Sequence, residues 1–267
     1  MDDHKTLYHF NNAKILVKKS LKMKRILASL FVCLALFGCK EKKENHLTIA
    51  TSADYPPLEF FKDGEIVGME IDLIRAIAKE LNYSTTIKDM SFDSIIGALQ
   101  TERVDLAISG ISATSERKEK VDFAIPHHKT LSVILVASSS SIEKASDLTG
   151  KNVGAQMGST YEKMIKDEWQ PTILNLTLRS LSKIPDLIQD FKSGRLDALV
   201  LGIAEAENIV KNHNDFKLIS LPQTEAVYAI ALPKNSPLTE KINAVIKKFE
   251  ADGTLKKIQD KWTEKGQ

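Results

Sequence analysis

The chain has 267 residues, of which 43% are hydrophobic and 27% charged, and its formal net charge is +2. This composition is close to the average of globular proteins. It excludes a strongly basic nucleic-acid binder, an acidic disordered chain and a collagen-like fibre. Only two cysteines are present, which excludes a scaffold held together by disulfide bonds. The length fits one large domain or two small ones.

The N-terminal region has the pattern of a bacterial lipoprotein signal followed by a tether. Met23-Lys24-Arg25 is basic, residues 26–38 carry no charge, and Leu36-Phe37-Gly38-Cys39 resembles a lipobox. The uncharged segment is too short to span a bilayer comfortably; a core helix with a buried thiol is the alternative. We predict that translation starts at Met23, so that residues 1–22 are not part of the protein, and that the signal is cleaved before Cys39. Lipidated Cys39 and a polar tether, residues 39–45, would then anchor the protein in the periplasm or cell envelope.

From residue 46 onwards, patterns typical of strands and helices alternate. The first half has strand patterns at 47–50, 104–111 and 131–137, a hairpin over 60–67 with its turn at Asp63-Gly64, and helix patterns at 71–81 and 93–101. The second half has strand patterns at 152–155 and 196–201, and helix patterns that begin near Thr160, Pro185, Ser236 and Leu255. This alternation predicts an α/β fold with mostly parallel sheets.

One segment of the sequence recurs. Residues 96–111 align without a gap on residues 188–203, and the matched pairs are Arg103 with Arg195, Asp105 with Asp197 and Gly110 with Gly202. Each copy is predicted to be a helix, a tight turn and a buried strand. Any helix–turn–strand unit could give such an alignment. The alternative interpretation is that the chain folds into two similar lobes. Since ligands bind beyond the carboxyl ends of strands in open α/β sheets, two such strand ends would face each other across a cleft.

The sequence lacks the common catalytic and nucleotide-binding motifs. There is no Gly-x-Ser-x-Gly elbow, Walker loop, Rossmann glycine set or His-Glu-x-x-His. His127 and His128 are adjacent, so in a strand they would point to opposite faces and could not share a metal ion. No pair of carboxylates stands out as an acid and a base. We therefore predict a binding protein without catalytic residues, metal or cofactor.

Three segments indicate contacts with a small ligand. Tyr55 is followed by two prolines that fix the backbone, so its ring could stack on a ligand or a cation. In Ser109–Arg117, Thr114 can cap a short helix and Arg117 can bind a carboxylate through two hydrogen bonds. Gly158-Ser159-Thr160 begins a helix whose free amides favour an anion. The alternatives are a tyrosine packed in a loop, a surface ion pair of Arg117 with Asp122 or Glu116, and an ordinary helix cap.

Five motifs resemble those of the polar amino acid family of periplasmic solute-binding proteins, the bacterial extracellular solute-binding proteins of family 3. They are Tyr55-Pro-Pro-Leu-Glu-Phe60, Val67-Gly-Met-Glu-Ile-Asp-Leu73, Ser109-Gly-Ile-Ser-Ala-Thr-Ser-Glu-Arg117, Val121-Asp-Phe-Ala-Ile-Pro126 and Gly158-Ser-Thr160. The resemblance covers residues 46–263. Within the family, the sequence is similar to the arginine-binding lipoproteins. It implies a type II periplasmic-binding-protein fold, hinged by two crossover strands, with lobe 1 at 46–131 plus 228–267 and lobe 2 at 132–227.

The resemblance also implies a function. The protein would be the substrate-binding component of an ABC importer that captures a polar or basic amino acid, with arginine as one candidate. It would deliver this ligand to an ABC permease in the inner membrane, act as a monomer and bind no nucleic acid. The open alternatives are an enzyme on the same scaffold, such as a dehydratase of a small carboxylate, and a ligand-sensing domain. The chain ends at Gln267 without a membrane helix or signalling module, which counts against a sensor.

Roles for individual residues follow from the resemblance alone. Arg117 would hold the ligand α-carboxylate together with the amides of Ser112 and Thr160. The Gly110 carbonyl and the Ser112 hydroxyl would bind the α-ammonium. The remaining implied contacts are Tyr55 and Phe92 around the side chain, Gln156 and Met157 from lobe 2, and Ser109, Ser159 and Gly202, with Ser52, Glu59 and Glu205 as further candidates.

Two positions depart from the family pattern. Relatives usually have an acid that pairs with the α-ammonium where this chain has Gly202, although Glu205 lies three residues further on. Relatives that bind basic ligands often have an acid or amide where Ser52 stands, and Asp54 is nearby. A buried ammonium without a charged partner is costly. The ligand could therefore bind weakly, use another acid, or not be a standard α-amino acid. His127 also replaces the usual aromatic residue after Pro126.

Overall fold

The computed structural model describes residues 45–263, apart from the side chains of 223–225 and 263. The predicted start at Met23, the signal and the lipidated Cys39 lie outside the described residues. Residues 45–267 cluster as one compact unit. Within the described part, every helix is too short or too polar to cross a membrane.

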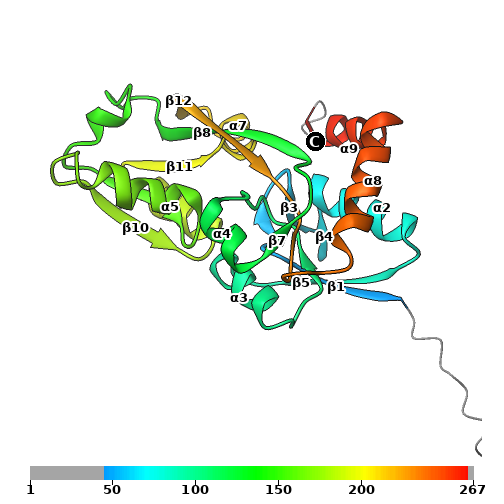
Figure 1. Ribbon diagram of the computed structural model, residues 1–267. Coiled ribbons are helices and arrows are strands. Elements are labelled where there is room, and N and C mark those ends of the chain that lie inside the picture. Colours follow the sequence, from blue (N-terminus) through cyan, green and yellow to red (C-terminus); the bar gives the residue numbers. More distant parts are fainter. Residues whose placement is uncertain (1–44, 264–267) are drawn as a thin grey trace, which may run out of the picture. The chain divides into compact units, whose positions relative to one another are not determined.

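The first sheet has five strands in the order β5-β1-β6-β13-β7. Figure 1 labels β1, β5 and β7 of this sheet. Their bounds are β1 His46–Thr51, β5 Ser84–Asp89, β6 Leu106–Ala107, β7 Asp122–Phe123 and β13 Ala231–Leu232. Strand β1 runs parallel to β5 and β6, whereas β13 is antiparallel to β6 and β7. Successive side chains of β1 alternate between two cores: Ile49 packs in one and Ala50 in the other.

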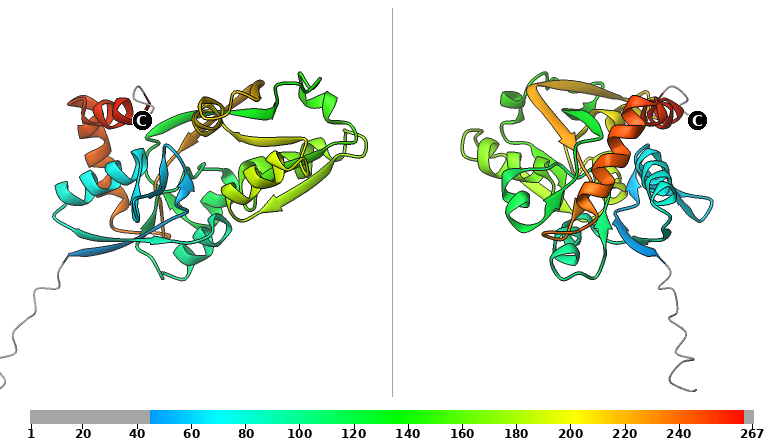
Figure 2. Two further views of the ribbon diagram at one scale, coloured as in Figure 1. Left: turned by 180° about the vertical axis from the view of Figure 1, so that it is seen from behind. Right: turned by 45° about the vertical axis from the view of Figure 1, so that its right-hand side comes forward.

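Helices cover both faces of this sheet. Helices α2 (Met69–Glu80), α8 (Thr239–Ala251) and α9 (Thr254–Thr263) contact one another and contribute to the core around Ile49, as Figure 2 shows. Helix α3 (Ile95–Gln100), preceded by the turn η1 (Phe92–Ser94), packs in the core around Ala50, and α4 (Ser115–Lys120) contacts α3 and β7. We call the first sheet and these helices lobe 1.

The second sheet has the order β10-β9-β11-β8-β12 and, with its helices, is called lobe 2. Its strands are β8 His128–Ala137, β9 Asn152–Gln156, β10 Thr177–Leu181, β11 Ala198–Gly202 and β12 Phe216–Tyr228. Helices α6 (Ile184–Lys192) and α7 (Ile203–Lys211) pack on one face. On the other face lie α5 (Thr160–Met164) and its π-helical continuation η3 (Ile165–Trp169). The short turn η2 (Ala145–Leu148) precedes β9.

Two long strands connect the lobes. β8 begins directly after lobe 1 at His128, and β12 leads back through Tyr228 to β13. They pair antiparallel, with a register shift between Ser220 and Glu225. This arrangement confirms the predicted α/β fold of two lobes hinged by crossover strands.

A small three-stranded sheet supplies one wall near the junction of the lobes. It contains β2 (Asp54–Tyr55), β3 (Glu59–Lys62) and β4 (Glu65–Val67), and the β3–β4 turn lies at Asp63-Gly64 as predicted. Asp63 and Gly64 have φ values of 52° and 83°, the left-handed conformation that a tight hairpin turn requires.

The internal repeat is a structural repeat. In lobe 1 the Thr48 amide donates to Asp105 Oδ2 at 2.7 Å, and in lobe 2 the Asn152 amide donates to Asp197 Oδ2 at 2.8 Å. Each aspartate thus joins the start of the repeated strand to the start of its parallel neighbour, β1 in lobe 1 and β9 in lobe 2. The starts of the repeated strands are therefore alike, but their ends differ, because β6 ends at Ala107, before Gly110, whereas β11 continues to Gly202.

Two expectations about the strands are wrong. The sheets are mixed rather than mostly parallel, because each contains two parallel and two antiparallel pairings. The strand predicted at 104–111 is reduced to β6 (Leu106–Ala107). Its apolar continuation is buried without strand pairing, since Ile108 and Ile111 both lie in the core.

Candidate ligand-binding site

A pocket of about 340 Å³, including its open mouth, lies where the two lobes meet. This size suits a small metabolite. Lobe 1 and the hairpin contribute Ser52, Asp54, Tyr55, Glu59, Phe92, Ser109, Gly110, Ser112 and Arg117, lobe 2 contributes Gln156, Ser159, Thr160 and Tyr161, and Tyr228 enters from the end of β12. Most of the lining residues have polar side chains, and the structure brings together residues that are far apart in sequence.

Arg117 is the cation of the pocket. Thr114 caps α4 by accepting a hydrogen bond from the Arg117 amide at 3.3 Å, as predicted, and so fixes the start of the helix. Nη1 of Arg117 donates to the Ser112 carbonyl, and Nη2 donates to the Gly158 carbonyl of lobe 2, both at 2.9 Å. The guanidinium also lies 5.4 Å from the centre of the Phe92 ring. Burial lowers the pKa of Arg117 from its ordinary value, so an anionic ligand would stabilise its charge.

The surface ion pairs considered for Arg117 are made by other cations. Asp122 pairs with Lys234, and Glu116 pairs with Lys120, each at 3.0 Å. The arginine side chain is directed instead to the junction of the lobes.

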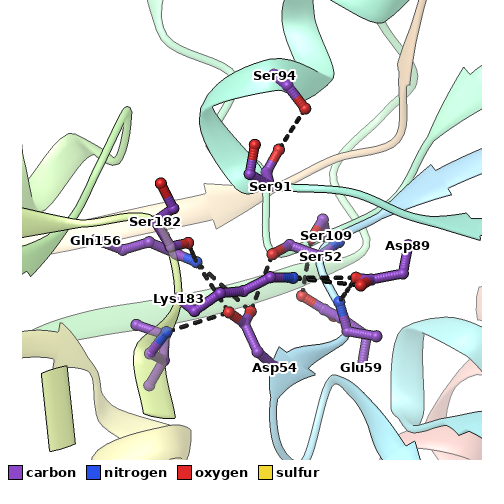
Figure 3. Close-up of polar contacts among 12 residues, drawn as sticks. Ser52, Asp54, Glu59, Asp89, Ser91, Ser94, Ser109, Gln156, Ser182 and Lys183 are labelled. Carbon is purple, nitrogen blue, oxygen red and sulfur yellow. Dashed lines mark hydrogen bonds and ion pairs between the residues drawn. The ribbon is translucent and has the colours of Figure 1, made fainter. Parts of the chain in front are cut away.

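Asp54 and Glu59 supply two carboxyl groups to the pocket. Asp54 accepts hydrogen bonds from the Ser52 hydroxyl at 3.0 Å and, across the junction, from the Ile184 amide at 3.1 Å (Figure 3). Glu59 accepts from the Ser109 hydroxyl at 3.1 Å through Oε1, while its Oε2 has no partner among the described residues. Burial raises the pKa of Asp54, and burial together with the neighbouring Glu70 raises that of Glu59 well above its usual range. A cationic ligand group would favour the ionised forms of both acids.

A buried hydrogen-bonded pair, Glu70 and His127, supports the loop of Gly110. Glu70 accepts from the Gly110 amide at 2.7 Å and from His127 Nε2 at 2.8 Å. Burial raises the pKa of Glu70, but its interactions with His127 outweigh that effect, and the net pKa is below the ordinary value. His127 precedes β8, so the pair connects the pocket loop to the start of one crossover strand. No group of metal-ligating side chains occurs among the described residues.

Three tyrosine hydroxyls converge on Gly202. Tyr55 Oη accepts from the Gly202 amide at 2.9 Å, and the hydroxyls of Tyr161 and Tyr228 are 3.1 Å apart. A Cβ atom on Gly202 would lie 2.8 Å from Tyr55 Oη and 3.0 Å from each of the other two hydroxyls. Burial raises the pKa of all three tyrosines, so they are neutral at physiological pH.

The loop at Gly158 forms an ordinary cap. Ser159 Oγ accepts from the Glu162 amide at 3.1 Å, and the Gly158 amide donates to Glu162 Oε2 at 2.6 Å. Ser159 and Thr160 still line the pocket. This segment is therefore both a helix cap and part of the pocket lining, and the two interpretations considered for it do not exclude each other.

Most of the residues singled out in the sequence lie together in the pocket. The predicted residues that line it are Ser52, Tyr55, Glu59, Phe92, Ser109, Gly110, Ser112, Arg117, Gln156, Ser159 and Thr160. Met157 is not part of the lining, and its side chain is 37% exposed. Its amide donates a hydrogen bond to the Leu181 carbonyl within lobe 2. Gly202 borders the pocket through the Tyr55 hydroxyl, whereas Glu205 is buried behind the lining.

Sequence reasoning missed three lining residues: Asp54, Tyr161 and Tyr228. The sequence marks Asp54 only as a residue near Ser52. Tyr161 directly follows the predicted Thr160 and could have been found from its place in the first turn of α5. Nothing local in the sequence marks Tyr228, because its role depends on where β12 ends.

Comparisons with known proteins agree with this architecture. The sequence model described as bacterial extracellular solute-binding proteins, family 3, matches residues 47–265. The arginine-binding extracellular protein ArtP of Bacillus subtilis (strain 168) is 36% identical over 246 residues, which cover 89% of this chain and 96% of ArtP. The L-cystine-binding protein TcyJ of Escherichia coli (strain K12) is 30% identical over 234 residues, 84% of each chain.

Solved structures show the same fold. The structure of an ancestral arginine-binding protein bound to arginine superposes with a TM-score of 0.78 at 38% identity, over 82% of this chain and 98% of that one. Family match, relatives and pocket geometry lead to one assignment: this chain belongs to the bacterial extracellular solute-binding proteins, family 3.

Proposed function

We propose that this protein is the substrate-binding component of an amino acid ABC importer and that its ligand carries a carboxylate and a cationic side chain, with arginine as the first candidate. The charge pattern of the pocket carries this proposal: Arg117 provides one guanidinium, and Asp54 and Glu59 provide two carboxyl groups. A zwitterion with an additional cation complements this set. Relatives named for arginine support the same choice.

Arg117 binds the ligand carboxylate in this proposal. Its guanidinium is already oriented by the Ser112 carbonyl and the Phe92 ring, so little side-chain freedom is lost on binding. The amides of Ser112 and Thr160 add donors. The bond to the Gly158 carbonyl is the one that a ligand carboxylate replaces.

The ligand side chain lies between Tyr55 and Phe92 and ends at the acids. Glu59 Oε2, which lacks a partner among the described residues, accepts a hydrogen bond from the ligand cation. Gln156 and Asp54 complete that end of the pocket. Charge-assisted hydrogen bonds of this kind are stronger than neutral ones.

Ligand capture works by closure of the two lobes, which we place at residues 46–131 plus 228–267 and 132–227. The ligand binds Arg117 and Tyr55 of lobe 1 first, and contacts to Thr160 and Gln156 of lobe 2 then favour the closed form. A ligand shifts this equilibrium only through the extra contacts that it makes in the closed state. The closed form delivers the ligand to a membrane permease, and the lipid on Cys39 keeps the protein at the envelope.

The enzyme alternative receives less support, because the family and the relatives consist of solute-binding proteins. A thermal-shift screen of the full chain with the twenty amino acids tests the proposal after unfolding and refolding have removed any co-purified ligand. L-arginine should raise the melting temperature in a concentration-dependent way. If none of the twenty compounds changes the melting temperature, the proposed function is wrong.

A further inference from the structure

The surroundings of Arg117 differ from those of the acids in the pocket. The guanidinium faces two backbone carbonyls and the Phe92 ring. The nearby acids Glu116 and Asp93 are exposed, and neither belongs to the pocket lining, although Asp93 lines an adjacent hollow. Among the side chains that the structure describes, the acids of the pocket are Asp54 and Glu59, and these are occupied with Ser52, Ser109 and the Ile184 amide rather than with Arg117.

The tyrosine hydroxyls occupy the space beside Gly202. Tyr55, Tyr161 and Tyr228 all line the pocket, and Tyr161 and Tyr228 are close enough to influence the charge of Arg117. Tyr55 Oη accepts the Gly202 amide, and its hydroxyl also interacts with those of Tyr161 and Tyr228. The three hydroxyls are neutral dipoles that suit carbonyl or carboxylate oxygens. They do not neutralise an ammonium group.

Glu205 does not supply the missing charge in the closed form. Its side chain is 1% exposed, neither carboxyl oxygen has a hydrogen-bond partner among the described residues, and it is not part of the pocket lining. Burial raises its pKa well above the ordinary value, and the nearby Asp54 adds to that effect. Glu205 is therefore enclosed behind the pocket wall, where burial favours its neutral form.

We propose, as a refinement that rests on the proposed function, that the pocket selects carboxylates with a remote cationic group and without a charged nitrogen beside the carboxylate. Such a ligand places its carboxylate at Arg117 and its cation at Glu59. The groups that contact Arg117 are two carbonyls and the Phe92 ring, so an ammonium next to the carboxylate would lose its water on closure without an acid beside it, which is unfavourable. A methylene or an acylated nitrogen at that position avoids this loss.

Calorimetry with three probes tests the inference on the refolded full chain. The probes are L-arginine, 5-guanidinopentanoate, which lacks the α-nitrogen, and agmatine, which lacks the carboxylate. We expect 5-guanidinopentanoate to bind on the order of tenfold more tightly than L-arginine, and agmatine to bind most weakly of the three. If L-arginine binds more tightly than 5-guanidinopentanoate, the inference is overturned while the proposed function stands. If no probe and no amino acid binds, the proposed function fails as well.

A variant of Glu205 separates the inference from the alternative that this acid pairs with an α-ammonium. In Glu205→Gln the ratio of the two affinities should stay the same, because this residue lies outside the lining of the pocket. A loss of L-arginine affinity alone, with 5-guanidinopentanoate unaffected, would assign the ammonium to Glu205 and refute the inference. Melting curves of the variant establish that it is folded.

Discussion

Replacement of Gly202 by alanine should impair closure much more than folding. The added Cβ would lie 2.8 Å from Tyr55 Oη, a group of the opposite lobe, and 3.0 Å from the hydroxyls of Tyr161 and Tyr228. Such overpacking typically costs about 1–3 kcal/mol, and loss of the Tyr55–Gly202 hydrogen bond costs about 0.5–1.5 kcal/mol. A total of about 2–4 kcal/mol corresponds to a loss of affinity of roughly 30- to 1000-fold.

Calorimetric titration with L-arginine measures this loss, and chemical denaturation without ligand measures stability. Stability should change little, because the Tyr161 ring end can move aside once Tyr55 withdraws on opening. Gly97→Ala is a matched control: a Cβ added to this exposed glycine of α3 would have nothing within 4 Å, so affinity should be unaffected. Adding Tyr55→Phe to Gly202→Ala removes the closest oxygen and should restore part of the affinity. An affinity of Gly202→Ala within threefold of the wild type would refute the reasoning.

Three further changes test the charged groups. Arg117→Ala should weaken L-arginine binding by at least about 30-fold in calorimetry, and the exposed Arg103→Ala should not; equal losses would contradict the role of Arg117. Glu59→Gln keeps a hydrogen bond to Ser109 but removes the acid that faces the ligand cation, so L-arginine should bind about tenfold more weakly. The exposed Glu65→Gln is the control and should leave the affinity unchanged. An unchanged affinity in Glu59→Gln would exclude Glu59 as the partner of the cation. Glu205→Gln should improve stability at alkaline pH. The pKa of wild-type Glu205 is raised in the folded state, so the folded protein keeps a proton that the unfolded chain releases above about pH 4.3. Above this pH the free energy of unfolding therefore falls by up to about 1.4 kcal/mol per pH unit, until the folded protein also releases the proton. Denaturation of both proteins from pH 4 to pH 9 measures the difference, and parallel curves would contradict it.

The elements predicted from the sequence are those with strong local signals. The Asp63-Gly64 turn, the Thr114 cap and the helix start at Pro185 each depend on a few adjacent residues, and all three occur in the structure. Strands β5 and β10 were not predicted. They are edge strands with few buried side chains, and their sequences therefore show little hydrophobic alternation.

In the pocket, too, the residues with a local sequence signal could be predicted, and those that meet only in the folded chain could not. Ser109–Arg117 could be identified because a polar loop follows a buried apolar segment, which is visible in a single stretch of sequence. The cluster at Gly202 could not, because it joins the ends of β2, β11 and β12 and the start of α5. These segments meet only through the antiparallel pairing of β8 and β12, which the expectation of mostly parallel sheets did not include.

The contacts between the lobes determine how a ligand can stabilise closure. Arg117 donates to the Gly158 carbonyl, and Asp54 accepts from the Ile184 amide, so both groups already make direct hydrogen bonds between the lobes. A carboxylate at Arg117 must replace the first of these bonds, and a cation at Asp54 competes with the second. The Tyr55–Gly202 bond and the Lys183–Asp89 ion pair also join the lobes, and the proposed ligand competes with neither. Affinity is therefore the difference between ligand contacts and the direct contacts that they replace, and weakening the direct contacts in the closed form should favour the liganded clamp over the empty one.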